Sequence, residues 1–367
     1  MYPWGTARDS HLSKVFVEVL RHNQIGAPRR PAREAINTGV QADAPSDGKG
    51  HGCDRRSARQ KQKTVEDKTA CSKMYRHTER GREKAAMKFT KYHALGNDYV
   101  VLDPADGNGT IPTGEQVKRI CNRNYGIGSD GVLFGPGKVP GYDFYLRIFN
   151  PDGSEAEKSG NGLRIFSRYL WDRSLVSSNP FTILTPGGPV TAQVGEDGKM
   201  VTVEMGKVVF DSTKIPVAGP AREVLDETIT VAGKTLHYCS ATIGNPHTVV
   251  ICSDISEDMA RRLGPLIETD KRFPHRTNVQ FMKVLNRDNI QIEIWERGAG
   301  YTLASGTSSA AAAAVAFRLG LCGSHVDVKM PGGIIEISIG KDYSIQMKGP
   351  VTRICEGTLF EEAFIYG

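Results

Sequence analysis

The sequence predicts an α+β fold with two pseudo-symmetric halves, each a curved sheet or barrel around a central helix. The main observation is a block that occurs twice. One strand-like run ends at Asn150, and Ser159-Gly160 follows nine residues later. A second run ends at Glu296, and Ser305-Gly306 follows at the same spacing. Each Ser-Gly pair opens a helical pattern that leads to a Pro-Gly-Gly turn. This repetition indicates an internal duplication with one candidate reactive position in each copy.

The first half begins with strands and a short helix. Residues 87–103 have the pattern of two short strands around a turn at Gly96-Asn97-Asp98. Residues 114–124 show the apolar spacing of a helix. The Gly-rich loop at 125–131 lacks the spacing of phosphate-binding and dinucleotide-binding loops. We therefore expect a tight turn that brings backbone close to the site. After Ser159, apolar side chains again recur at helical spacing.

The remaining elements repeat this order. Residues 182–206 alternate like strands, and residues 229–296 are expected to form a second set of strands and loops. The Ala-rich segment 310–319 is the second helix, and its small side chains on every side predict that a sheet surrounds it. Residues 334–347 and 358–366 are expected to be the strands that close the chain.

Charge separates an N-terminal segment from the rest of the chain. The formal net charge is +6, and the basic excess lies in residues 1–86, whereas the rest is close to neutral. The first segment has little sustained apolar periodicity, so we expect a basic, disordered extension, with Met87 as an alternative start. We expect a first domain in 87–204 together with 351–367, and a second in 205–350.

The composition also narrows the function classes. The near-neutral globular part argues against nucleic-acid binding there. The sequence contains no apolar run long enough to span a bilayer and no evident secretory signal. The seven cysteines form no CxxC pair and no metal-binding spacing. These features predict reduced thiols, no metal, no membrane partner and a cytoplasmic location.

The two Ser-Gly pairs have two interpretations. Serine is a common helix N-cap, so each could be purely structural. A matched pair of facing helix N-termini, however, makes a site for an anion such as a carboxylate.

Several motifs in sequence order resemble those of diaminopimelate epimerases. They are His93-Ala94-Leu95-Gly96-Asn97-Asp98-Tyr99, Asn150-Pro151-Asp152-Gly153-Ser154, Gly244-Asn245-Pro246-His247 and Glu296-Arg297-Gly298-Ala299-Gly300. The resemblance covers essentially all of residues 87–367. It implies the fold of that family and epimerisation of LL-diaminopimelate to the meso form without PLP or metal. It also implies an amino-acid substrate as the partner and allows a homodimer.

The resemblance further implies a set of substrate-binding residues. The α-carboxylate would lie on backbone N–H groups of Gly160-Asn161 and Gly306-Thr307. The other end of the substrate would be held by a polar shell of Asn97, Asn150, Asn245, His247, Asn278, Glu296 and Arg297. Each member also has an ordinary interpretation, since a lone Asn is often a turn former and a Glu-Arg pair is often a solvated surface pair.

The departure from the family pattern lies at the reactive positions. The family uses two facing cysteines, and both positions are serine here, Ser159 and Ser305. Tyr301 also replaces a glutamate. A serine hydroxyl is far less acidic than a thiol, and a helix N-terminus cannot ionise it at neutral pH, so serine needs a neighbouring base. Glu155 and Glu157 are candidates, and Tyr301 is a third.

Alternatives therefore stay open. The chain could be a cofactor-free epimerase that uses Ser159 and Ser305, an isomerase of the same fold acting on another small acid, or a non-catalytic amino-acid-binding protein. A deliberate replacement of both cysteines by serine is a further alternative, but the additional differences from the family at Tyr301 and Ser308 argue against it.

Overall fold

The computed structural model describes residues 87–107 and 109–364. The basic extension expected for residues 1–86 lies outside the described residues. Within the described part, no helix is long and apolar enough to cross a membrane.

The strands of the first half form a sheet with a defined order of neighbours. They are β1 (Met87–Ala94), β2 (Asn97–Leu102), β3 (Val132–Val139), β4 (Tyr142–Phe149), β6 (Phe181–Thr185), β7 (Gly188–Val194) and β8 (Met200–Lys207). From β1 to β8, successive neighbours pair antiparallel, parallel, antiparallel, parallel, antiparallel and antiparallel. A short strand, β5 (Glu155–Ala156), pairs antiparallel with β4.

The second half repeats this order strand for strand. Its members are β10 (Lys234–Thr242), β11 (Pro246–Ile251), β12 (Asn278–Asn286), β13 (Asn289–Glu296), β15 (His325–Met330), β16 (Gly333–Ile339) and β17 (Ser344–Pro350). Their neighbours pair in the same sequence of directions, and β14 (Gly300–Thr302) pairs with β13 as β5 does with β4. The two pseudo-symmetric halves predicted from the repeated block are thus confirmed.

Strands outside the repeat complete the sheet. β9 (Glu227–Val231) forms a hairpin with β10, and β18 (Thr352–Leu359) returns to pair antiparallel with β1. β8 and β17, the last strands of the two repeats, pair with each other and join the halves. The domain boundaries expected at 204 and 351 stay a prediction.

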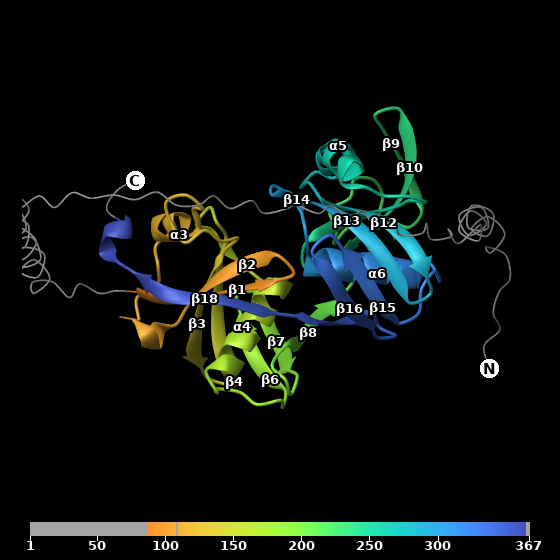
Figure 1. Ribbon diagram of the computed structural model, residues 1–367. Coiled ribbons are helices and arrows are strands. Elements are labelled where there is room, and N and C mark those ends of the chain that lie inside the picture. The colour runs from red at the N-terminus through yellow and green to blue at the C-terminus, as the bar shows by residue number, and fades with distance from the viewer. Residues whose placement is uncertain (1–86, 108, 365–367) are drawn as a thin grey trace, which may run out of the picture. The chain divides into compact units, whose positions relative to one another are not determined.

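Each half wraps its sheet around one helix, as Figure 1 shows for α4 (Gly160–Asp172) and α6 (Gly306–Arg318). Helix α4 contacts β1, β2, β3, β7 and β8, and α6 contacts β10, β11, β12, β13, β15 and β16. The five alanines from Ala310 to Ala314 are fully buried. Small side chains let the surrounding strands approach α6 closely from all sides, as the sequence predicts.

Two helices lie at the periphery. α3 (Gly114–Cys121) begins with a capping box between Thr113 and Gln116. α5 (Glu257–Glu268) falls where strands and loops are expected, so that prediction is wrong for this segment. The Gly264-Pro265 pair resembles a helix break, but the apolar face of α5 packs against β12 and β13, and this burial outweighs the local preference.

The C-terminal strand is also shifted from its expected position. Residues 358–366 are predicted to be a strand, yet β18 ends at Leu359 and a 3₁₀ helix, η2 (Glu361–Phe364), follows. A second such turn, η1 (Pro104–Asp106), follows β2. The register of β18 is set by its pairing with β1, which ends at the Met87–Leu359 pair.

Candidate active site

A cavity of about 740 Å³ lies where α4 and α6 begin. Its walls include strand ends and loops of both halves. The cavity brings together eleven of the residues that the sequence nominates. They are Asn97, Asn150, Ser159, Gly160, Asn161, Asn245, Glu296, Arg297, Ser305, Gly306 and Thr307.

The other two nominated residues, His247 and Asn278, lie behind the cavity wall. His247 is fully buried, and its Nε2 lies 2.9 Å from Asn245 Oδ1. Burial lowers the pKa of His247 to about 3, so the neutral ring donates this bond. Asn278 Oδ1 accepts from the Arg297 N–H at 3.0 Å. His247 therefore orients the Asn245 side chain, and Asn278 holds the backbone of Arg297; both Asn245 and Arg297 line the cavity.

The starts of α4 and α6 meet in the cavity. Ser159 and Ser305 are the N-caps, and their hydroxyl oxygens accept from the backbone N–H groups three residues on, at 3.1 and 3.4 Å. A Cβ on Gly306 would lie 3.7 Å from Gly160 Cα and 2.8 Å from Met347 Sδ. Glycine at position 306 lets Met347 pack directly against the start of α6. The positive ends of two helices thus face one cavity, which favours an anion.

Ser159 has a phenol as its neighbour. The Tyr99 hydroxyl lies 3.2 Å from Ser159 Oγ. A Cβ on Gly131 would lie 2.5 Å from the Tyr99 ring, so the Gly-rich loop leaves the space that this ring occupies. Burial raises the pKa of Tyr99 to about 12, which keeps the phenol protonated at neutral pH. Tyr99 can therefore supply a proton to Ser159.

Ser305 has a carboxylate as its neighbour. Glu296, at the end of β13, hydrogen-bonds the Ser305 side chain. Burial raises the pKa of Glu296, and the bond to Ser305 offsets part of this effect. Thr307 Oγ1 also lies 3.5 Å from Ser305 Oγ. A carboxylate with a raised pKa beside a hydroxyl is the arrangement of a general base.

Of the three bases nominated from the sequence, Glu155 and Tyr301 have other hydrogen-bond partners, whereas the side chain of Glu157 is not engaged in this way within the described residues. Glu155 pairs with Arg147 at 2.7 Å, and the Tyr301 hydroxyl donates to Glu293 at 2.8 Å. Glu157 lines the cavity, as does Tyr301. Tyr99 was not predicted as a partner of Ser159, and Glu296 was predicted only as a member of the substrate shell. The equal spacing from Glu296 to Ser305 and from Asn150 to Ser159 was the available signal.

A chain of side-chain amides crosses the cavity wall. Asn97 Nδ2 donates to Asp130 Oδ2 at 2.9 Å, and Asn161 Nδ2 donates to Asn97 Oδ1 at 2.9 Å. Arg164 in turn donates to Asn161 Oδ1 at 2.8 Å. Asp130 comes from the Gly-rich loop, which agrees with the expected approach of that loop to the site. Each amide is thereby held in one orientation.

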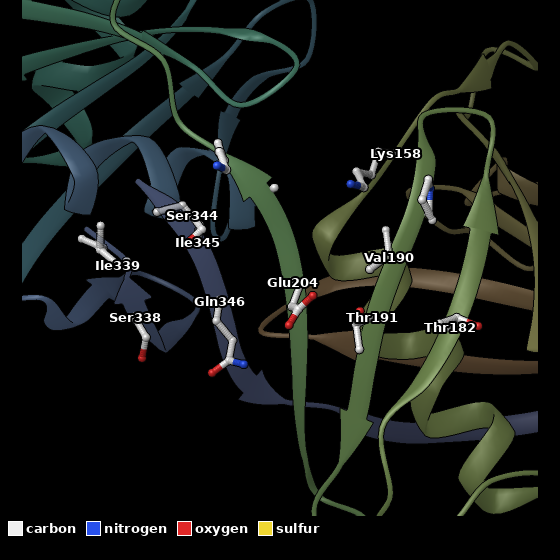
Figure 2. Close-up of a pocket in the computed structure, with 14 residues that line it drawn as sticks. Lys158, Thr182, Val190, Thr191, Glu204, Ser338, Ile339, Ser344, Ile345 and Gln346 are labelled. Atoms are coloured by element: carbon white, nitrogen blue, oxygen red, sulfur yellow. The ribbon is translucent and has the colours of Figure 1, made fainter. Parts of the chain in front are cut away.

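A second cavity, of about 680 Å³, adjoins the first, and Lys158 lines both. Figure 2 shows Lys158 beside strand β7, which carries Val190 and Thr191, with Glu204 of β8 and Gln346 of β17 on the further strands. Partial burial lowers the pKa of Lys158. In the described residues, no group of three or more His, Cys, Asp or Glu side chains is arranged to hold a metal ion.

Comparison with known proteins agrees with this architecture. The family model described as diaminopimelate epimerase matches residues 89–210 and 239–354. The chain is 59% identical over 278 residues to diaminopimelate epimerase 2 of Nostoc sp., covering 76% of this chain and 97% of that one. It is 38% identical over 277 residues to the diaminopimelate epimerase of Caldanaerobacter subterraneus, covering 74% and 99%.

A solved structure supports the fold. A probable proline racemase from Agrobacterium radiobacter, with bound carbonate, superposes with a TM-score of 0.57 at 16% identity, covering 76% of this chain and 94% of that one. The family match, the two close relatives and the duplicated fold lead to one assignment: the chain belongs to the diaminopimelate epimerase family.

Proposed function

We propose that this isomerase inverts one α-carbon of LL-diaminopimelate to give the meso form, without PLP or a metal. The observation that carries the proposal is the convergence of Ser159 and Ser305 at the starts of two helices in one cavity. The substrate α-carboxylate would bind the backbone N–H groups of Gly160-Asn161 and Gly306-Thr307. The two hydroxyls would then serve opposite faces of the α-carbon.

The polar lining supports diaminopimelate as the substrate. Its second ammonium and carboxylate need several hydrogen-bonding partners away from the reacting carbon. Asn97, Asn150, Asn245 and Arg297 line the same cavity and can supply them. His247 and Asn278 would support this shell from behind. The names of the relatives point to the same substrate.

The proton transfers use the neighbours of the two serines. Ser305 Oγ takes the α-proton while its own proton passes to the Glu296 carboxylate. The electron pair of the broken C–H bond spreads into the substrate carboxylate. Ser159 then donates its hydroxyl proton to the opposite face of the carbon, and Tyr99 passes its proton to Ser159 Oγ. Exchange with water restores Glu296 and Tyr99 to their starting states, and the reverse reaction follows the same path.

Meso-diaminopimelate formation would place the protein in lysine biosynthesis and in the cytoplasm. We also propose that it forms a homodimer, as the resemblance allows. Size-exclusion chromatography with light scattering would give twice the chain mass, whereas a mass of one chain would contradict the dimer.

A second function, binding without turnover, is favoured by one observation: serines stand where the family has thiols. NMR of the full chain with LL-diaminopimelate in D₂O separates the two. Loss of the α-proton signal is expected. If the α-proton of another amino acid exchanges and that of diaminopimelate does not, the protein is a racemase of that amino acid. If a ligand binds saturably and no α-proton exchanges, the protein is a binding protein.

A further inference from the structure

Arg164 lies one turn into α4 and is a fully buried charged residue without a carboxylate partner in the described part of the chain. Its side chain has no exposed surface, and its Nη2 donates to Asn161 Oδ1 at 2.8 Å. Its Nη1 lies 3.1 Å from Met347 Sδ, and its Nε has no hydrogen-bond partner among the described residues. Within residues 87–107 and 109–364, no carboxylate lies at ion-pair distance from Arg164.

Such a charge is costly to bury. A buried guanidinium is normally paired with a carboxylate, because desolvation opposes an isolated charge. Burial lowers the pKa of Arg164 to about 10, so the group is still a cation at neutral pH. A negatively charged group that binds nearby during function would compensate the charge of Arg164 and so explain why a cation is buried there.

The position of Arg164 points to where that anion binds. Met347, which Arg164 contacts, lies beneath both helix starts: a Cβ on Gly160 would be 2.6 Å from its Cε, and one on Gly306 would be 2.8 Å from its Sδ. A Cβ on Gly349 of β17 would be 3.2 Å from Arg164 Nη1, so backbone packs closely against the guanidinium. The cation is therefore held close to the two helix N-termini.

The repeat shows that this cation is not a general requirement of the fold. Arg164 lies five residues after Ser159, and the residue five after Ser305 is Ala310. One half alone provides a charge beneath the shared cavity.

We propose that Arg164 is a positioning residue that stabilises the second negative charge formed on the substrate carboxylate when the α-proton leaves. It acts through Asn161, whose amide it orients at the cavity wall. The C–H bond breaks, its proton goes to the base, and its electron pair makes the carboxylate dianionic. Because the charge grows only in this step, Arg164 favours the transition state over the bound substrate. This inference rests on the proposed epimerase function.

Steady-state kinetics of three full-chain variants test it. Arg164→Met removes the charge at similar volume and is expected to lower kcat on the order of 10²–10³-fold with a much smaller change in KM. Arg164→Lys keeps a charge and should recover at least tenfold over Arg164→Met. Arg168→Met makes the same change one turn further along α4, where Arg168 pairs with Asp172 at 2.8 Å, and should leave kcat unchanged.

Two kinetic results would overturn the inference: an unchanged kcat in Arg164→Met, or a rise in KM alone. A merely structural role predicts instead a lower melting temperature and no recovery with lysine. Thermal melts of all three variants are therefore compared with the kinetics.

A binding measurement separates this inference from the substrate assignment. Calorimetry with sulfate, a dianion, and acetate, a monoanion, needs no turnover. Arg164→Met should weaken sulfate binding at least tenfold and acetate binding less. Equal weakening, or no anion binding by the unmutated chain, would overturn the role of Arg164. Absence of diaminopimelate exchange by the unmutated chain, with the anion pattern intact, would overturn only the proposed function.

Discussion

The two halves of the molecule have the same backbone plan and different chemistry at equivalent positions. Ser159 and Ser305 adopt nearly the same N-cap conformation, with φ and ψ of −141° and 119° in one and −144° and 123° in the other. Their neighbours differ, because Tyr99 reaches Ser159 and Glu296 reaches Ser305. The two hydroxyls are thus placed alike in both halves, while their neighbours come from elements that are not counterparts: a phenol from β2 in one half and a carboxylate from the end of β13 in the other.

The central helices differ in the same way. Helix α4 buries polar groups, among them Arg164 and Tyr169, whose hydroxyl donates to Asp103 at 2.7 Å. Helix α6 buries a run of alanines in the equivalent place. The buried cation therefore belongs to the helix of the first half, and the carboxylate beside Ser305 belongs to the second half.

Removal of the Glu296 carboxylate, which only the second half places beside its serine, should have the largest effect. Glu296→Gln should lower turnover on the order of 10³–10⁴-fold, because Ser305 would lose the group that accepts its proton. The measurement is α-proton exchange in D₂O. Glu293→Gln is the matched control, since Glu293 lies on the same strand but bonds Tyr301. Equal rates in the two variants would remove Glu296 from the base role.

The pH profile sharpens the same point. Glu296 must be ionised to act as a base, and burial raises its pKa. Activity should therefore fall as the pH decreases through a value above the ordinary glutamate range. A kcat/KM that stays constant down to the ordinary range would contradict this assignment.

Removing either hydroxyl should have the next largest effect. Ser159→Ala and Ser305→Ala should each lower turnover about 10²–10³-fold and spare substrate binding. Each change also removes an N-cap, at a cost of about 1 kcal/mol of stability, which a denaturation curve would measure. Unchanged turnover in both variants would exclude the hydroxyls from proton transfer.

The phenol of the first half should matter less than the carboxylate of the second. Tyr99→Phe should slow turnover about 10–100-fold, since water can partly replace the lost proton donor. Initial rates are measured separately from the LL and meso forms with deuterated solvent. A uniform loss of affinity with no loss of rate would make Tyr99 a binding residue instead.

Thiols at both positions test how far the site matches its family. The double variant Ser159→Cys, Ser305→Cys should raise exchange about tenfold, because a thiol with an ordinary pKa of about 8.5 ionises much more readily than a hydroxyl. Exchange in D₂O is again the measurement. No gain would indicate that the surroundings of Tyr301, or the substrate, differ from the family.

The smallest effect concerns stability. Burial lowers the pKa of His247 to about 3 in the folded protein, whereas in the unfolded chain it returns to its ordinary value of about 6.5. The unfolded chain therefore binds an extra proton between these values, and stability should fall as the pH decreases from 6.5 toward 3. Urea unfolding at pH 7.5 and 5 should show a loss about 1–2 kcal/mol smaller in His247→Asn than in the unmutated chain. The control variant His325→Asn, at an exposed histidine, should lose as much unfolding free energy between pH 7.5 and 5 as the unmutated chain. If His247→Asn also loses as much, His247 is not the residue responsible for this pH dependence.

The fold could be predicted from local patterns. Strand alternation, helical spacing, Ser caps and the repeated block are all properties of short segments, and they predict two halves, each with a central helix. Local reasoning failed at α5, where Gly264-Pro265 resembles a break, and at the end of β18, where pairing with a distant strand sets the boundary.

The sequence by itself determined the duplication, the two helix starts and the polar residues gathered around them. Only the tertiary structure decided which groups lie beside the two serines. Tyr99 lies 60 residues from Ser159, and Arg164 lies 183 residues from Met347. These contacts depend on strand pairing and helix burial across the whole chain. Such long-range contacts cannot be predicted from the periodicity of a short segment, because the partners and the pKa of a side chain depend on the residues that the fold packs against it.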